Sequence, residues 1–268
     1  MVKPKSIALI GAGRMGSAMA SGWVRGVDSP DISIVAPRPS EVVQGWERAA
    51  KASINVPPHP TDVLVIAVKP QVFGSIEAEI REWVFPKTLV ISVMAAVKIK
   101  SLQERLGTQR VVRAMPNTPG SIGKGITLLS VPAGLPGSDV TAARQLLEPL
   151  GMVEGPMSED ELLAATTVCG CGPAYVYLLA EVMAAAGEAQ GLDPEFAMRL
   201  AKHTVFGGSA LMEASGETPA ALREAVTSPG GVTKAALDVL MEPKAMPSLF
   251  EEALKAAAAR DRELSEES

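Results

Sequence analysis

The sequence contains few cysteine, histidine or aromatic residues. Of its 268 residues, 2 are cysteine, 2 are histidine and 4% are aromatic. Cys169 and Cys171 are separated by a single glycine, a spacing that would strain a disulfide between them, so we expect free thiols. His59 and His203 form no recognisable ligand cluster with them. The sequence therefore predicts neither a disulfide framework nor a metal site.

An excess of positive charge is also absent. The chain has 25 lysines and arginines against 30 acidic residues, a net charge of −5. Nucleic-acid binding requires clustered basic residues that displace counterions, and no such cluster occurs. The most apolar helical stretch, residues 174–187, is too short to cross a bilayer and contains Glu181, while residues 1–6 lead directly into a strand. We expect a soluble, unprocessed, cytoplasmic protein that binds neither nucleic acid nor membrane.

The first half of the chain alternates between two hydrophobic periods. Up to about residue 153, short β-branched runs alternate with helical patterns, which is typical of an α/β fold. We expect a doubly wound parallel sheet with helices on both faces. The predicted strands are 7–10, 32–35, 63–68, 89–93, 111–115 and 126–131. The predicted helices are 15–25, 41–51, 72–83, 99–106 and, after the last strand, 140–147.

The second half of the chain is predicted to be entirely helical. After about Pro156 strand signals stop, and Asp193-Pro194 and Thr218-Pro219 are typical of helix starts. Alanine-rich helices with few aromatics bury little area each, so we expect a partner subunit to complete the core. This predicts a Rossmann domain at 1–156 and a helical domain at 157–268. The predicted helices are 162–168, 173–190, 194–214, 219–226, 233–240 and 248–264.

A glycine-rich loop follows the first predicted strand. It has the sequence Gly11-Ala12-Gly13-Arg14-Met15-Gly16 and opens a predicted helix. In this context G-x-G-x-x-G binds a pyrophosphate on the helix N-terminus. A tight turn with glycines for packing alone is the alternative, but it does not explain why both flanks match. We therefore expect a dinucleotide cofactor.

The end of the second predicted strand indicates which dinucleotide is used. The segment Ala36-Pro37-Arg38-Pro39-Ser40 has no carboxylate where an NAD enzyme usually binds the ribose hydroxyls. Arg38 and Ser40 suit a ribose 2′-phosphate, because a guanidinium matches phosphate geometry. We expect NADPH, with NADH as the alternative cofactor and a solvated surface arginine as the alternative interpretation of Arg38.

Polar residues follow the later strands at the edge of the sheet where ligands bind. Lys69, Asn117 and Thr118 lie at positions from which a nicotinamide, its ribose or a substrate is within reach. Satisfying loop backbone is the alternative role for each of them.

A second ligand site is predicted near the end of the chain. Paired glycines in Ser228-Pro229-Gly230-Gly231-Val232-Thr233 precede a predicted helix. Its free N–H groups, its dipole and the Thr233 hydroxyl point to one anion, such as a small carboxylate. A cofactor site together with an acidic-substrate site indicates an enzyme.

Together these motifs resemble those of the pyrroline-5-carboxylate reductase family, and the resemblance covers nearly the whole chain. It implies that NAD(P)H gives hydride to the C=N carbon of 1-pyrroline-5-carboxylate, which yields L-proline in the last step of its synthesis. It also implies a helical domain that interlocks two subunits, an active site near that interface, and larger rings of dimers. The segments that carry the resemblance are 11–16, 67–71, 113–119, 170–175 and 228–233.

The resemblance also assigns residues to sites. It implies that residues 11–15 bind the pyrophosphate, that Ala36 and Arg38 bind the adenosine end, and that Val68, Lys69 and Ala95 lie on the nicotinamide side. Gly231, Val232 and Thr233 receive the substrate carboxylate, with Thr233 as the leading donor and Lys69 as the other catalytic candidate. Glu159 is a weaker substrate candidate, with helix-start electrostatics as its alternative role.

The chain departs from the family's usual pattern at a few positions. Cys169 and Cys171 replace serines, which bears on substrate affinity more than on reaction type because thiols donate weaker hydrogen bonds. Val232 stands where the family has a hydroxyl residue or alanine, and Ala96 where it often has glycine. The proline-rich segment 52–61 is irregular, which makes an adenine contact at Asn55 doubtful.

Two other functions are compatible with part of this pattern. The β-hydroxyacid dehydrogenases share a glycine loop and a helical second domain but use a lysine early in that domain, and residues 166–192 contain none. A non-catalytic NADPH-binding sensor is the other. Tyr175 and Tyr177, on an apolar helix, are interpreted as core residues rather than proton donors.

Overall fold

The protein is described here from a computed structural model that places residues 4–25 and 29–266. Residues 1–3, part of the segment 1–6 that was expected to lead into the first strand, lie outside the described residues. The chain forms two compact units, Met1–Cys171 with Ala258–Ser268, and Gly172–Ala257. The domain boundary at residue 156 remains a prediction.

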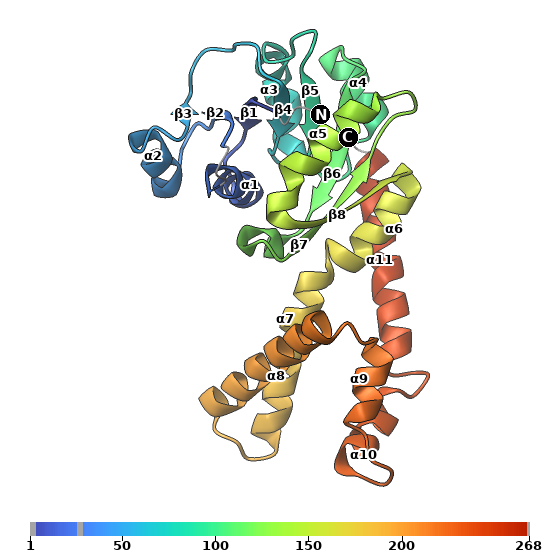
Figure 1. Ribbon diagram of the computed structural model, residues 1–268. Helices are drawn as coiled ribbons and strands as arrows, with labels where there is room; N and C mark the ends of the chain where they lie inside the picture. The colour runs from blue at the N-terminus through green and yellow to red at the C-terminus, as the bar shows by residue number, and fades with distance from the viewer. Residues whose placement is uncertain (1–3, 26–28, 267–268) are drawn as a thin grey trace. The chain divides into compact units, whose positions relative to one another are not determined.

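The first unit contains a mostly parallel sheet of eight strands in the order β3-β2-β1-β4-β5-β6-β7-β8 (Figure 1). Because β1 lies between β2 and β4, the chain reverses its direction of winding there, and the carboxyl ends of β1 and β4 form the ligand-binding edge of such sheets. This confirms the predicted doubly wound fold. The strands are β1 Ser6–Ile10, β2 Asp31–Val35, β3 Ser53–Ile54, β4 Val63–Ile66, β5 Leu89–Ser92, β6 Val111–Pro116, β7 Gly125–Ser130 and β8 Gly151–Met157.

Helices cover both faces of this sheet, as predicted. Ile7 and Leu9 pack with α1 (Arg14–Arg25), α2 (Glu41–Arg48) and α5 (Gly137–Leu147). Ala8 and Ile10 point to the other face and pack with α3 (Pro70–Arg81) and α4 (Ile99–Leu106). Because side chains alternate between the faces and both faces are covered, residues 7–10 of β1 are all apolar. Short 3-10 helices at Thr118–Ile122 and Glu148–Leu150 complete the unit.

The last strands differ from the predicted arrangement. Strand β7 runs antiparallel to β6, and β8 follows α5 although no strand was expected there. A Cβ on Gly151 would lie 2.2 Å from the Gly125 oxygen, and one on Gly155 would lie 2.4 Å from the Leu129 oxygen. The close pairing of β7 and β8 therefore requires glycines, the residues that usually indicate a strand end. Strand β3 was missed because only two residues pair.

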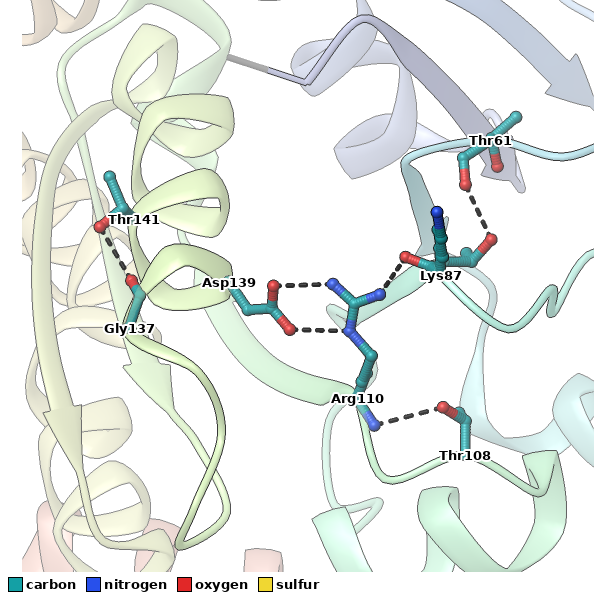
Figure 2. A network of polar contacts seen from close by, with 8 residues as sticks. Thr61, Lys87, Thr108, Arg110, Gly137, Asp139 and Thr141 are labelled. Atoms are coloured by element: carbon teal, nitrogen blue, oxygen red, sulfur yellow. Dashed lines mark hydrogen bonds and ion pairs between the residues drawn. The ribbon is translucent and has the colours of Figure 1, made fainter. Parts of the chain in front are cut away.

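An ion pair joins helix α5 to the amino-terminal ends of β5 and β6 (Figure 2). Arg110 Nε and Nη2 lie 2.8 and 2.7 Å from the two carboxylate oxygens of Asp139, and Arg110 Nη1 donates to the Lys87 carbonyl. Hydrogen bonding to Asp139 raises the pKa of Arg110, so the guanidinium stays charged. This bidentate pair lies at the end of the strands opposite the ligand-binding edge.

The second unit is helical, as predicted. It contains α7 (Gly172–Ala189), α8 (Pro194–Ser215), α9 (Pro219–Ala225) and α10 (Val232–Leu240), with α7 and α8 side by side (Figure 1). The expected caps are present: the Asp193 carboxylate accepts from Phe196 N at 3.0 Å, and Thr218 Oγ1 accepts from Ala221 N at 3.2 Å. Helix α6 (Glu159–Cys169) belongs to the first unit, and α11 (Met246–Glu266) has residues in both.

The surface of the second unit is strongly apolar. Its one buried cluster among the described residues consists of Ala184, Ala197 and Ala201. The expectation that residues 174–187 are too short to cross a membrane concerned only part of a longer apolar segment. That segment, Glu159–Ala189, comprises α6 of the first unit and α7 of the second and is long and apolar enough by length and composition, with only 11% of its most apolar window buried. A helix that packs against a second subunit has the same properties.

Candidate functional site

The glycine loop after β1 has the geometry of a pyrophosphate cradle. Gly11 has φ +97°, and a Cβ there would lie 2.7 Å from the Ala67 oxygen, while a Cβ on Gly16 would lie 2.0 Å from the Gly11 oxygen. At Gly13, by contrast, an added Cβ meets no described atom within 4 Å. Two glycines therefore permit close packing of strand and helix, and Gly13 leaves open space in front of the N-terminus of α1. This division of roles fits a bound dinucleotide.

The remaining loop residues lie around the same helix start. Ala12 and Met15 are half-buried, and Met15 packs on the core, whereas Arg14 is exposed as the first residue of α1. Ser17 Oγ donates to the Ala12 carbonyl at 2.9 Å, which fixes the turn from its inner side. The backbone that faces a pyrophosphate is thus held by contacts within the loop.

The end of β2 is fixed by an unexpected partner. The side-chain amide of Asn55 accepts from Ala36 N at 2.9 Å and donates to Ala36 O at 3.0 Å. Asn55 has φ +50°, a conformation that asparagine tolerates better than most residues. Arg38 is exposed beyond this point, and Ser40 caps α2 by accepting from Val43 N at 3.4 Å. Arg38 is therefore an exposed cation next to the position predicted for the adenosine end.

The residues predicted for the nicotinamide side follow β4 and β5. Val68 lies against the glycine loop, because a Cβ on Gly11 would be 2.9 Å from its Cγ1. Lys69 is exposed at the start of α3, and Ala95 is exposed in the loop between β5 and α4. Its neighbour Ala96 is buried with φ +60°, which explains why glycine suits that position in the family's usual pattern.

The predicted cofactor contact Asn117 is engaged within the protein. Its Nδ2 donates to the Cys169 carbonyl at 2.9 Å, and its Oδ1 accepts from Ile126 N at 2.9 Å. The side chain is buried, with 9% of the residue exposed. Asn117 thus connects the end of β6 to β7 and to the last residue of α6. Thr118 begins the adjacent 3-10 helix.

Glu159, predicted as a weaker substrate contact, is also engaged within the protein. Its Oε1 accepts from Ile99 N at 3.0 Å and from Arg113 Nη1 at 3.1 Å. Arg113 is 4% exposed on β6. Arg113 was assigned no role from the sequence, although a basic residue inside an otherwise apolar strand is a signal for a buried ion pair.

The two cysteines lie at the junction of α6 and α7. Both are partly exposed free thiols. Burial raises the pKa of the Cys169 thiol, which keeps it protonated at neutral pH. No group of three or more potential metal-ligating histidine, cysteine or acidic residues occurs in residues 4–25 and 29–266.

The second predicted site lies at the start of α10. Gly230 has φ +70°, which favours glycine, and a Cβ on Gly231 would lie 2.4 Å from Ser228 Oγ and 3.1 Å from the Ser228 carbonyl oxygen, so each glycine fits its position for a different reason. Gly231 occupies the N-cap position without a side-chain cap among the described residues. Val232 and Thr233 are exposed in the first turn. The first-turn N–H groups and the Thr233 hydroxyl are available to an anion.

Comparison with known families matches most of the chain. Residues 159–264 match the family described as pyrroline-5-carboxylate reductase dimerisation, and residues 6–96 match the family described as NADP oxidoreductase, coenzyme F420-dependent. The pyrroline-5-carboxylate reductase of Pisum sativum is 34% identical over 97% of this chain and 96% of its own length. That of Pseudomonas aeruginosa is 35% identical over 97% of each.

Solved structures give the same result. The structure of a pyrroline-5-carboxylate reductase from Coxiella burnetii has a TM-score of 0.88 and 30% identity, and covers 98% of this chain and 99% of its own. That of Plasmodium falciparum pyrroline carboxylate reductase, determined with NADP bound, has a TM-score of 0.80 and 26% identity over 97% of this chain and 98% of its own.

Proposed function

This chain belongs to the pyrroline-5-carboxylate reductase family and reduces 1-pyrroline-5-carboxylate to L-proline with NADPH, and we propose which of its residues carry out each task. It is an oxidoreductase of proline biosynthesis and acts as a homodimer. The roles below rest on the positions of residues within each compact unit.

We propose that the first unit binds NADPH along the carboxyl ends of its strands. Residues 11–15 bind the pyrophosphate, since Gly13 leaves space before the helix N-terminus. Ala36 and Arg38 bind the adenosine end, with Arg38 on the 2′-phosphate. Val68, Lys69 and Ala95 border the nicotinamide. The bound cofactor supplies the hydride.

We propose that the start of α10 binds the substrate carboxylate. The carrying observation is the start of α10 after Gly230 and Gly231, where the N–H groups from Val232 onward have no side-chain cap among the described residues and the Thr233 hydroxyl is exposed. The Gly231 N–H itself donates to the Ser228 carbonyl at 3.0 Å. Val232 offers an apolar contact to the ring. Glu159 is left out of the substrate set, because its Oε1 already accepts two hydrogen bonds and its charge repels a carboxylate.

The chemistry requires little acid catalysis from the protein. A cyclic imine takes its proton from water, and the iminium then accepts hydride at carbon. Thr233 fixes the carboxylate, and Lys69 helps to hold the nicotinamide side in place, so acceleration comes mainly from positioning. For Asn117 we keep the predicted cofactor contact as a proposal. We also propose that it holds the backbone at Cys169 in place through its hydrogen bond to the Cys169 carbonyl.

Paired variants test this assignment. We expect Thr233→Ala to lower kcat/KM for the imine, with a loss of transition-state stabilisation of about 1.5–3 kcal/mol, because one hydrogen bond to a charged group is lost. KM for NADPH is expected to stay unchanged. We expect Arg38→Ala to weaken the binding of NADPH by about 1 kcal/mol relative to the binding of NADH, with KM for the imine unchanged. Initial-rate kinetics with both substrates varied measures each effect, and each variant is the control for the other.

Either result can contradict the proposal separately. Unchanged imine kinetics in Thr233→Ala would remove the start of α10 from the substrate site. An unchanged NADPH-to-NADH ratio in Arg38→Ala would make Arg38 a solvated surface residue. Thr233→Ser, which keeps the hydroxyl, is expected to retain most of the activity.

Three finer statements are also proposals. We propose a cofactor domain at 1–156 and a substrate and dimerisation domain at 157–268, which the dimerisation match from residue 159 supports. We propose a cytoplasmic enzyme that binds no membrane, with the exposed apolar surface of Glu159–Ala189 assigned to subunit contact. Rings of dimers are supported by the family resemblance, and light scattering of the purified protein measures them.

A further inference from the structure

We infer that Glu159 and Arg113 are positioning residues for the nicotinamide-side loop, defined here as residues 93–98 between β5 and α4. The inference rests on the proposed function in one respect, the placement of Ala95 beside the nicotinamide. It assigns Glu159 a task different from the substrate contact expected from the sequence. All the residues concerned lie in the first compact unit.

Glu159 holds the end of this loop. Its Oε1 accepts from the backbone N–H of Ile99, at 3.0 Å, and Ile99 is the first residue of α4. The cap position of α4, Lys98, makes no side-chain cap hydrogen bond among the described residues. Glu159, 60 residues away in sequence, provides an acceptor for one of the free N–H groups of the first turn, that of Ile99. A carboxylate is also favoured there by the helix dipole.

Arg113 holds Glu159 in this position. Its Nη1 lies 3.1 Å from the same Oε1, and 5% of its side chain is exposed against 31% for Glu159. Within the described part of the chain, the buried Nε of Arg113 has no hydrogen-bond partner. A buried cation with an incomplete set of partners depends strongly on its one counter-charge, so the pair is held together.

The start and the middle of the loop are fixed in other ways. Ser92 Oγ accepts from Met94 N at 3.3 Å, and Ala96 is buried with φ +60°. Ser92 is also the register partner of Arg113 across β5 and β6. Both ends of the loop around Ala95 are therefore held by β6, the strand that carries Arg113. The start is held by the pairing of Ser92 with Arg113, and the end is held through Glu159.

This arrangement links cofactor geometry to helix α6. Glu159 is the first residue of α6, and the last, Cys169, has its carbonyl bound by Asn117. Both ends of α6 are therefore fastened to the ligand-binding edge of the sheet. Hydride transfer is sensitive to misplacements of about 1 Å, so loosening this loop is expected to slow the chemical step more than it weakens substrate binding.

The test compares Glu159→Ala with Asp139→Ala. Asp139 forms another Arg–carboxylate pair of the same unit, at the opposite ends of the strands (Figure 2). For Glu159→Ala we expect kcat to fall about tenfold and the primary isotope effect with NADPH deuterated at the transferred C4 position to increase, with KM for the imine changed less than twofold. For Asp139→Ala we expect a lower Tm with kcat and isotope effect unchanged.

Conservative variants keep the test decisive. Glu159→Gln retains an acceptor for Ile99 N and is expected to lose less activity than Glu159→Ala. Arg113→Lys keeps the charge and is expected to retain activity, whereas Arg113→Met is expected to match Glu159→Ala.

Two results would overturn the inference while the proposed function stands. One is an unchanged kcat and isotope effect in Glu159→Ala. The other is an equal change in Asp139→Ala, which would indicate general loosening of the unit. If the wild-type enzyme oxidised no NADPH with the imine, both the proposed function and this inference would be overturned.

Discussion

The two compact units bury their apolar side chains in different ways. In the first unit the strands alternate apolar residues between two clusters, and Phe73, Leu9 and Ile34 are at most 1% exposed. In the second unit Leu178 is 56% exposed and Phe206 is 71% exposed. The first unit is stabilised by its own core, whereas the second needs the apolar surface of another copy. We expect the family's homodimer to supply that surface.

Breaking the dimer should have the largest effect. We expect Phe206→Glu to abolish dimerisation and reductase activity, because a charge placed in an apolar contact costs about 3–5 kcal/mol when it is buried without a partner. NADPH binding by the first unit should persist. Light scattering measures the mass and calorimetric titration measures cofactor affinity.

Phe206→Leu is the control for this experiment, since it keeps the apolar surface. A dimeric and fully active Phe206→Glu protein would show that this part of α8 lies outside the subunit contact.

Weakening the first unit should have a smaller and different effect. We expect Asp139→Ala to lower its free energy of unfolding by about 2–3 kcal/mol, less than for a fully buried pair because a third of the Arg110 side chain is exposed. Denaturant titration followed by Trp fluorescence measures the loss, and the dimer should remain. Glu251→Ala, which removes an exposed pair with Lys255, should leave stability unchanged.

Strengthening the first unit should have the smallest effect. Ala50 is exposed with φ +54° just after α2, a position that suits glycine. We expect Ala50→Gly to raise the free energy of unfolding by about 0.5–1 kcal/mol, because the relief of left-handed strain exceeds the added entropy of the unfolded chain. Ala49→Gly, at φ −87°, is the control and should bring no gain. Equal effects of the two changes on thermal unfolding would contradict this explanation.

The same contrast explains what the sequence allowed us to predict. Runs such as Val63–Ile66 are apolar because both faces of the sheet are covered, so pattern alone located them. Strand β8 was not predicted, because Gly151 and Gly155, which its close pairing requires, usually indicate the end of a strand.

The ligand loops could be predicted because their glycines are local signals. The supporting contacts could not. Arg113 and Glu159 are 46 residues apart, and Asn55 and Ala36 are 19 apart, so only the fold shows that they meet. Glu159 and Asn117 were selected as candidates for their position, but the contacts found for their side chains are with the protein itself.

The amide of Asn55 continues the ladder of β2 and β3 by one more step. Strand β3 ends at Ile54, yet the Asn55 side chain satisfies both backbone groups of Ala36 as a further strand residue would. The sheet's hydrogen bonding at this edge thus stops at Ala36, and the exposed Arg38 lies beyond it. We therefore expect that a design to exchange one cofactor for the other can be confined to positions 37–40, with the supporting strands left as they are.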